Sequence, residues 1–189
     1  FLKIISMLLL IRYYLQLKFT MEFKINIKDT DIQKFKDMNY GLSNEIPIKI
    51  ILENIFNMKL THTLFKYSSF DWFDNNNRFL FELKSYRYSY NKNETEIIGV
   101  NKGLTNNTIF IFQHENIDLY FIQYNNDLFK TFKKRYIPYR GGSSLCYDIP
   151  KQYLIKIDIN NVYELKHYMS DYELTKQYIL NDKLNYDKS

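Results

Sequence analysis

The feature that most constrains this chain is a pair of apolar, aromatic-rich segments separated by three consecutive asparagines. The segments cover residues 64–73 and 78–85, and Asn75, Asn76 and Asn77 lie between them. Asparagine tolerates the backbone conformations of tight turns, so this arrangement predicts an antiparallel β-hairpin. A hairpin also fixes which residues of its two strands lie opposite each other.

Glu82 and Lys84 interrupt the second strand of the predicted hairpin, which is otherwise strongly apolar. Side chains two residues apart on a strand point to the same face, so the two charges lie side by side. A turn centred on the asparagines places Asp71 opposite residues 81–83, within a cross-strand pair of Glu82. Asp74 lies roughly 10 Å from Glu82 in the same register, so Asp71 is the better partner.

Two carboxylates beside a lysine are the arrangement that metal-assisted phosphodiester cleavage requires. Asp71 and Glu82 offer hard oxygen ligands, which hold Mg²⁺ (or Mn²⁺) and leave positions open for water and phosphate. The backbone carbonyl of Leu83 is a further ligand candidate. Lys84 can orient or help deprotonate the nucleophile and offset charge on the phosphate. The competing interpretation is a pair of ordinary salt bridges on a half-exposed strand.

The remaining apolar segments predict an α/β or α+β domain with a mixed central sheet flanked by helices. We expect a helix over residues 43–58, a second hairpin from 108–112 and 118–122, and a strand over 153–157. A C-terminal helical tail is expected within residues 161–189. Gly141–Ser144 is predicted to be a loop, which would not separate two domains.

Two short segments, Phe70-Asp71-Trp72 and Phe81-Glu82-Leu83-Lys84-Ser85, resemble the Asp…Glu-x-Lys signature of the PD-(D/E)xK nuclease superfamily. The second is similar to the Glu-Leu-Lys-Ser form of uncharacterised members from large DNA viruses and phages. The resemblance covers roughly residues 41–157. It implies a restriction-endonuclease-like core, in which a helix is followed by three strands, a helix and another strand. It also implies Mg²⁺-dependent hydrolysis of DNA phosphodiester bonds.

Further site residues follow from the same resemblance. Many members carry an acidic residue on the first helix, and Glu45, 26 residues before Asp71, matches it, with Glu53 as the fallback. Arg87, shortly after the motif, is expected to contact phosphate. Lys102 is assigned the same role, because residues 97–102 resemble the segment that leads into the next core helix.

A basic cluster farther along the chain is a candidate DNA contact through phosphates, which gives affinity without sequence preference. The alternative is a solvated polar face. Its residues are Lys130, Lys133, Lys134 and Arg135.

Length and charge favour one domain without strong electrostatic attraction to nucleic acid. The chain has 189 residues and a net charge of +5. Three of its cations lie in residues 1–20, which contain no acid and are interpreted as an upstream leader to a single domain over residues 21–189. From Met21 onward the chain has 23 basic and 21 acidic residues, so any DNA surface must come from local clustering.

The sequence also limits compartment and partners. Cys146 is the only cysteine, which excludes an intramolecular disulfide and a zinc site of several thiolates. The eight-residue apolar stretch near the start is too short to span a bilayer and is not followed by a cleavage site for export. These features predict an intracellular protein without a membrane anchor, and the resemblance implies DNA as its partner and, for a viral member, a virus-infected cell as its setting. Monomer and homodimer both remain open.

The hypothesis has two alternatives. A domain of the same fold without catalytic activity could bind nucleic acid or a protein partner. The other alternative is a virion or host-interaction protein with an accidental motif, which a site in which Asp71 and Glu82 point apart would favour. His62, His114 and His167 show no spacing typical of metal ligands and are assigned structural or surface roles.

Overall fold

The fold is described from a computed structural model of the chain. The structure describes residues 44–64, 68–86, 95–99, 104–115, 118–139 and 142–188. All of them belong to one compact unit, Tyr40–Ser189. The predicted leader at residues 1–20 and the predicted phosphate contacts Arg87 and Lys102 lie outside the described residues.

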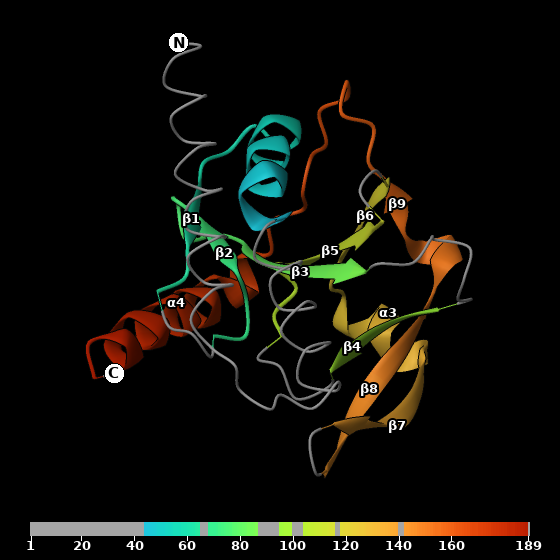
Figure 1. The fold of residues 1–189 in the computed structure, drawn as a ribbon. Coiled ribbons are helices and arrows are strands. Elements are labelled where there is room, and N and C mark those ends of the chain that lie inside the picture. Colours follow the sequence, from blue (N-terminus) through green and yellow to red (C-terminus); the bar gives the residue numbers. More distant parts are fainter. Residues whose placement is uncertain are drawn as a thin grey trace, which may run out of the picture. The chain divides into compact units, whose positions relative to one another are not determined.

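A six-stranded sheet forms the centre of this unit, with strand order β1-β2-β3-β5-β6-β9 (Figure 1). The strands are β1 Leu60–His62, β2 Trp72–Asp74, β3 Leu80–Tyr86, β5 Thr108–His114, β6 Asp118–Gln123 and β9 Ile155–Lys156. β3 and β5 are parallel, and the other neighbouring strands are antiparallel. The prediction of a mixed sheet is therefore confirmed, and the mixture of helices and strands is compatible with α+β.

The asparagine turn forms the predicted hairpin. β2 and β3 pair with Trp72 opposite Phe81 and Phe73 opposite Leu80. Asn77 has a φ of 55°, a left-handed conformation that asparagine adopts more readily than most residues. Beyond the last pair, Asp71 bonds to Phe81 through its N–H and to Leu83 through its carboxylate, so it lies beside residues 81–83, as the sequence predicts.

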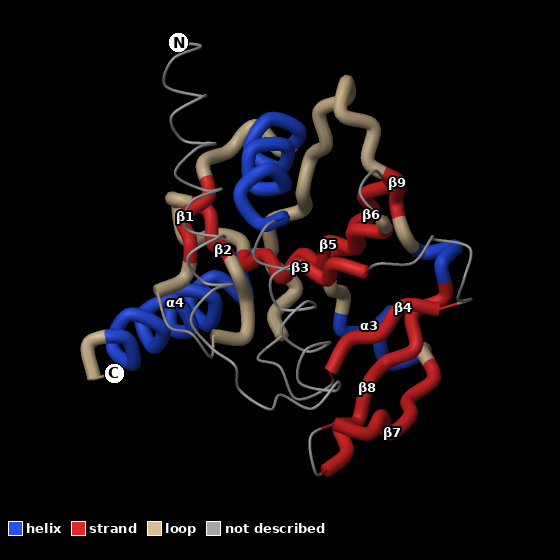
Figure 2. Tube along the Cα trace, viewed as in Figure 1, coloured by secondary structure: helices blue, strands red, loops and turns tan. Residues whose placement is uncertain are grey.

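The two faces of the sheet are covered by different elements. A helix over residues 44–55 lies on one face, as Figure 2 shows, and buries its apolar stripe against Trp72, Phe81 and Leu83. On the other face Ile179 of α4, Tyr172–Tyr186, packs with Phe73 and other side chains of the hairpin. Because alternate side chains of β3 point to opposite faces, this hairpin contributes to both cores.

A second sheet of three strands, which the sequence did not predict, lies beside the first. Its order is β4-β8-β7, with β4 Thr95–Gly99, β8 Gly142–Pro150 and β7 Lys133–Tyr139. Ile98, Tyr147 and Ile149 of this sheet share a core with Phe110 and Phe112 of β5. This shared core holds the two sheets together.

The second sheet corrects one expectation. Gly142–Ser144, expected to be a loop, begin β8, because pairing with β7 starts at Gly142, which lies opposite Tyr139. Residues 97–99, from the segment expected to lead into a core helix, lie in strand β4, and residues 100–102 lie outside the described residues. Among the described residues between β3 and β5, none is helical.

The C-terminal segments are also displaced from their predicted positions. Residues 151–153 form a 3-10 helix (η2), so the strand predicted over 153–157 is reduced to β9. Residues 162–168 are not helical, and a second 3-10 helix (η3, Met169–Asp171) leads into α4. Tyr163 explains this, because its N–H donates to the carbonyl of Ile55 over 2.6 Å and its ring packs against Phe56. None of the described helices is long and apolar enough to cross a membrane.

Candidate active site

Asp71 lies where the pairing between β2 and β3 ends. Its backbone N–H donates to the carbonyl of Phe81 over 2.8 Å. Its carboxylate Oδ2 accepts a hydrogen bond from the backbone N–H of Leu83 over 2.6 Å. The side chain therefore satisfies an N–H of β3 that a longer β2 would pair through its backbone. This fixes the Asp71 carboxylate against the edge of β3, beside the middle of the Glu82-Leu83-Lys84 motif.

Glu82 and Lys84 share one face of β3, because the alternating residues Phe81 and Leu83 belong to the core under the helix over residues 44–55. The Lys84 ammonium forms an ion pair with the Glu82 carboxylate. Glu82 is only 5% exposed, whereas the Lys84 side chain keeps 31% of its surface exposed. The pair thus combines a buried carboxylate with an ammonium that reaches solvent.

The surroundings of Asp71 disfavour its ionised form. Burial raises the pKa of Asp71 to about 7, and the nearby Glu82 and Glu45 carboxylates add to this shift. The hydrogen bond from Leu83 and the charge of Lys84 oppose it. The charge of Glu82 acts on Asp71, so the two carboxylates lie within electrostatic reach of each other.

Glu45 joins these carboxylates from the start of the helix over residues 44–55. Burial and the charge of Glu82 raise its pKa. His62 of β1 lies beside it, with 3.5 Å between its Nε2 and the Glu45 Oε2. Burial and the charge of Lys49 lower the pKa of His62, so the imidazole is mainly neutral at pH 7 and does not balance the carboxylate.

Glu53, the fallback for Glu45, has a different environment on the same helix. Its carboxylate accepts from the backbone N–H of Leu60 over 2.9 Å and from the Lys49 ammonium over 3.0 Å. Although burial raises its pKa, these bonds and the nearby lysines lower it further, so the net shift is downward. Glu53 therefore joins the helix to β1, and Glu45 remains the site candidate.

Among the described residues, no group of three or more His, Cys, Asp and Glu side chains is arranged to hold a metal ion. The donor set nevertheless fits Mg²⁺ chemically, because Asp71, Glu82 and Glu45 offer only carboxylate oxygens. The N–H and C=O of one strand residue point to the same side of the strand. Because the Leu83 N–H bonds to Asp71, the Leu83 carbonyl also points toward the side on which Asp71 lies. A bound cation would relieve the repulsion that raises the carboxyl pKa values.

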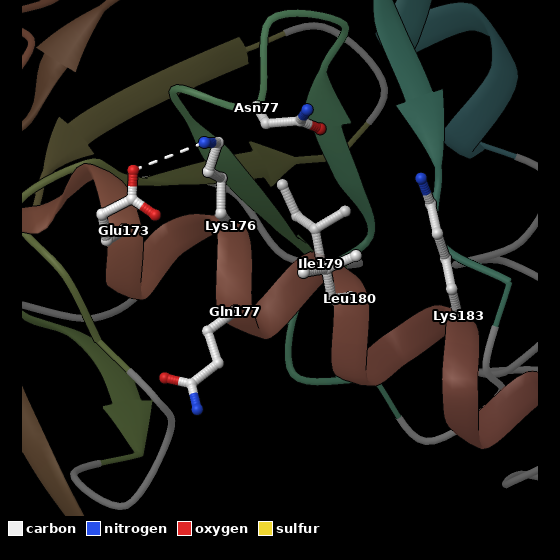
Figure 3. Close-up of a pocket in the computed structure, with 7 residues that line it drawn as sticks. All are labelled: Asn77, Glu173, Lys176, Gln177, Ile179, Leu180 and Lys183. Atoms are coloured by element: carbon white, nitrogen blue, oxygen red, sulfur yellow. Dashed lines mark hydrogen bonds and ion pairs between the residues drawn. The ribbon is translucent and has the colours of Figure 1, made fainter.

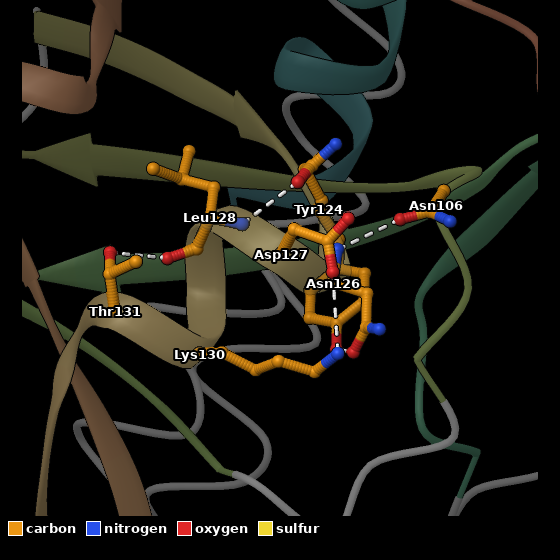
Figure 4. Close-up of polar contacts among 8 residues, drawn as sticks. Asn106, Tyr124, Asn126, Asp127, Leu128, Lys130 and Thr131 are labelled. Atoms are coloured by element: carbon orange, nitrogen blue, oxygen red, sulfur yellow. Dashed lines mark hydrogen bonds and ion pairs between the residues drawn. The ribbon is translucent and has the colours of Figure 1, made fainter.

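The predicted basic cluster is divided between two elements. Lys130 lies in α3, Asn126–Thr131, and its ammonium is 3.3 Å from the exposed carboxylate of Asp127 (Figure 4). Lys133, Lys134 and Arg135 are exposed on β7. They belong to the outermost strand of the second sheet, and the helix and the strand present separate cationic surfaces.

His62 is the residue at the site that the sequence analysis did not include. It reaches Glu45 because β1 pairs with β2 and places His62 opposite Trp72, where the two rings make an edge contact. The available signal was the sequence Leu60-Thr61-His62, in which a buried and an exposed residue alternate before the hairpin. A three-residue strand is too short for such a pattern to stand out.

The described part of the chain also has a hollow of about 480 Å³ along α4, shown in Figure 3. Lys176, Ile179 and Lys183 line it together with Asn77 of the hairpin turn. It contains none of the predicted site residues. No protein-family model, curated protein or solved structure matches this chain.

Proposed function

We propose that the protein is a metal-dependent nuclease that hydrolyses DNA phosphodiester bonds at Asp71, Glu82 and Lys84. One observation carries the proposal. The Asp71 carboxylate is held against β3 by the Leu83 N–H, where the charge of Glu82 raises its pKa, and the Glu82 carboxylate pairs with a lysine that reaches solvent. Glu45 adds a third carboxylate from a different element.

The expected cofactor is Mg²⁺, with Mn²⁺ as a substitute. Asp71, Glu82 and Glu45 would hold it together with the Leu83 carbonyl. When bound, the ion supplies positive charge that polarises the phosphate and acidifies water. The hydrogen bond from Leu83 prepares Asp71 for this role, because it orients the carboxylate and stabilises the ionised form that a metal requires.

Lys84 acts on the phosphate in this proposal. Its ammonium carries three N–H donors, and the side chain reaches solvent. A donor directed at a non-bridging phosphate oxygen would stabilise the charge that develops in the transition state. Lys84 can also orient the attacking water, and its position two residues from Glu82 keeps both functions on one face of β3.

The order of elements also supports the restriction-endonuclease-like core. A helix precedes β1, β2 and β3, and β5 then lies parallel to β3. The difference is strand β4, which stands among the described residues where the resemblance implies a helix. The carboxylates and the lysine lie on the segments that the resemblance requires, so the difference lies outside the proposed site.

DNA is the partner that we propose, with phosphate contacts from Lys133 and Arg135, which lie two residues apart on β7 and so share one face of the second sheet. The setting that goes with this substrate is intracellular. A monomer cuts one strand at a time, and a homodimer would be needed for coordinated cleavage of both.

A second function is favoured by two observations. The described residues contain no preassembled metal-holding group, and Lys84 neutralises Glu82. Both fit a domain of the same fold that binds nucleic acid or a protein without cleaving anything.

Cleavage assays on plasmid, linear and branched DNA, with Mg²⁺ and with Mn²⁺, separate the two functions. We expect Asp71→Asn, Glu82→Gln and Lys84→Met each to reduce the rate about 100-fold or more. Asp127→Asn and Lys130→Met are matched controls, because this exposed ion pair offers the same charges away from the site. Both controls should cut like the wild type.

A second readout follows metal binding without cleavage. Mg²⁺ should raise the melting temperature of the wild type and leave that of Glu82→Gln unchanged. A wild type that cuts none of the substrates and gains no stability from either metal would refute the nuclease and support the non-catalytic alternative.

A further inference from the structure

A pocket of about 510 Å³ lies at the second sheet, away from the carboxylates. It is lined by side chains of β4, β7 and β8, by the end of α3 and by η2. A volume of this size is within the range of pockets that hold small organic ligands. The lining includes two cations, Lys133 and Arg135, and one aromatic residue with an exposed ring, Tyr153.

The cations of this pocket share one face of the sheet. Lys133 pairs with Asp148 and Arg135 pairs with Cys146 across β7 and β8, so these four side chains point to the same side. Arg135 Nε donates to the Asp148 carboxylate over 2.6 Å, which balances the one acid of the set. Lys133 remains as exposed excess charge, so the pocket favours an anion.

The aromatic side of the pocket is held in place. The Tyr153 ring lies 5.0 Å from the buried ring of Phe132, measured between centroids. Tyr153 nevertheless keeps 41% of its surface exposed. The neighbouring Gln152 brings an amide that can donate and accept hydrogen bonds. An anchored aromatic ring beside an amide offers stacking and polar contacts to a planar heterocycle.

From these features we infer that the pocket binds one nucleotide of a single-stranded nucleic acid, with its base on Tyr153 and its phosphate at Lys133 and Arg135. Base stacking on aromatic rings combined with backbone contacts to cations is the usual mode of single-strand binding. The bases of a duplex are stacked on each other and cannot enter. The identity of the ligand as nucleic acid rests on the proposed function.

The sheet provides a matched control for each contact. Lys134 is adjacent to Lys133 but points to the opposite face, where its Nζ lies 5.0 Å from the centre of the Tyr147 ring. Tyr136 is 70% exposed on that same opposite face and does not line the pocket. The variants Lys133→Met and Lys134→Met therefore remove the same charge from two sides of one strand.

The test is fluorescence anisotropy with a labelled oligonucleotide of about 12 nucleotides, in EDTA so that cleavage cannot interfere. Loss of one stacked base or one phosphate contact should weaken binding about 10-fold for Tyr153→Leu and for Lys133→Met. Tyr136→Leu and Lys134→Met should change it less than about 2-fold, since neither side chain lines the pocket. Circular dichroism of each variant verifies the fold.

Four results would overturn the inference. Equal losses from Lys133→Met and Lys134→Met would mean diffuse attraction, and a duplex bound as tightly as the single strand would mean phosphate contacts alone. Binding of dAMP or dTMP without binding of the oligonucleotide would assign the pocket to free nucleotides. If no probe binds at all, the pocket does not bind nucleotides. Normal oligonucleotide binding by a protein that never cleaves DNA would instead refute only the nuclease.

Discussion

Asp71 and Asp74 lie three residues apart in the same hairpin, yet their carboxylates have opposite environments. Asp74 has no exposed surface, and its oxygens accept from the backbone N–H groups of Asn76, Arg78 and Phe79 and from the Arg78 side chain. Asp71 accepts from one backbone N–H, and its pKa is raised by burial and by the charges of Glu82 and Glu45. Asp74 therefore stabilises the turn, whereas the surroundings of Asp71 disfavour its ionised form.

The comparison shows that burial alone does not identify a functional acid. A buried carboxylate whose oxygens are filled by backbone donors stabilises the fold. A carboxylate held beside like charges costs stability, and such unfavourable arrangements occur where a ligand or a reaction needs them. Mutations at the two positions should therefore change the free energy of unfolding in opposite directions.

The largest effect is expected at the turn. Asp74→Ala leaves three backbone N–H groups and the Arg78 side chain without their acceptor, so we expect the free energy of unfolding to fall by about 3–5 kcal/mol. Urea denaturation measures this free energy of unfolding. Asn76→Ala, an exposed change in the same turn, should stay within about 0.5 kcal/mol of the wild type. A mild effect of Asp74→Ala would mean that the asparagines hold the turn without it.

The next effect has the opposite sign. Asp71→Asn removes a carboxyl group with a raised pKa, so we expect stability to increase by about 1–3 kcal/mol at pH 8 in metal-free buffer. Between pH 3.8, the ordinary pKa of the group, and about pH 7, Asp71 keeps its proton in the folded wild type but loses it in the unfolded chain. Wild-type stability from this group is therefore present below pH 4 and lost as the pH rises through 7.

The difference between wild type and Asp71→Asn isolates this titration. Urea midpoints of both proteins from pH 4 to pH 8 should diverge steadily with pH. Parallel curves over that range would show that Asp71 ionises normally and that the contrast with Asp74 is smaller than the structure indicates.

The smallest effect compares two glutamates of one helix. Glu45→Gln removes a repelling charge and should stabilise the protein by up to about 1 kcal/mol at pH 8, while it lowers the pKa of Asp71. Glu53→Gln should destabilise, because it weakens the bonds to Leu60 and Lys49. Thermal unfolding of both variants measures the contrast. Destabilisation by both changes would place Glu45 among the structural acids.

The hairpin and its charged residues could be predicted because their signals are local. The asparagine turn, the alternation along β3 and the spacing of Glu82 and Lys84 all lie within a short stretch of chain. The second sheet could not be predicted in the same way. β7 is exposed and rich in charged residues, so it lacks the apolar pattern of a buried strand. β4 pairs with a segment about fifty residues later in the chain, so no local pattern predicts it.

The start of α4 shows a second limit of local patterns. Asp171 Oδ2 accepts from the backbone N–H of Asn106 over 2.5 Å, and the Thr175 hydroxyl lies 3.2 Å from that of Thr105. These contacts with a distant loop fix where the helix begins. The position of Asp71 beside residues 81–83 followed from the turn, but the approach of Glu45 depends on how the helix packs on the sheet, which only the structure shows.

The position of α4 affects when the site can form during synthesis. Ile179 covers the hairpin residues Phe70, Phe73 and Leu80, and Asp182 accepts from the N–H of Leu64 over 2.8 Å. Residues 172–186 leave the ribosome long after the hairpin that carries Asp71. Until then the apolar face of that hairpin is uncovered, and an emerging chain holds its acidic residues on an incompletely packed support. The fold therefore delays assembly of the carboxylate cluster until translation of the described chain is nearly complete.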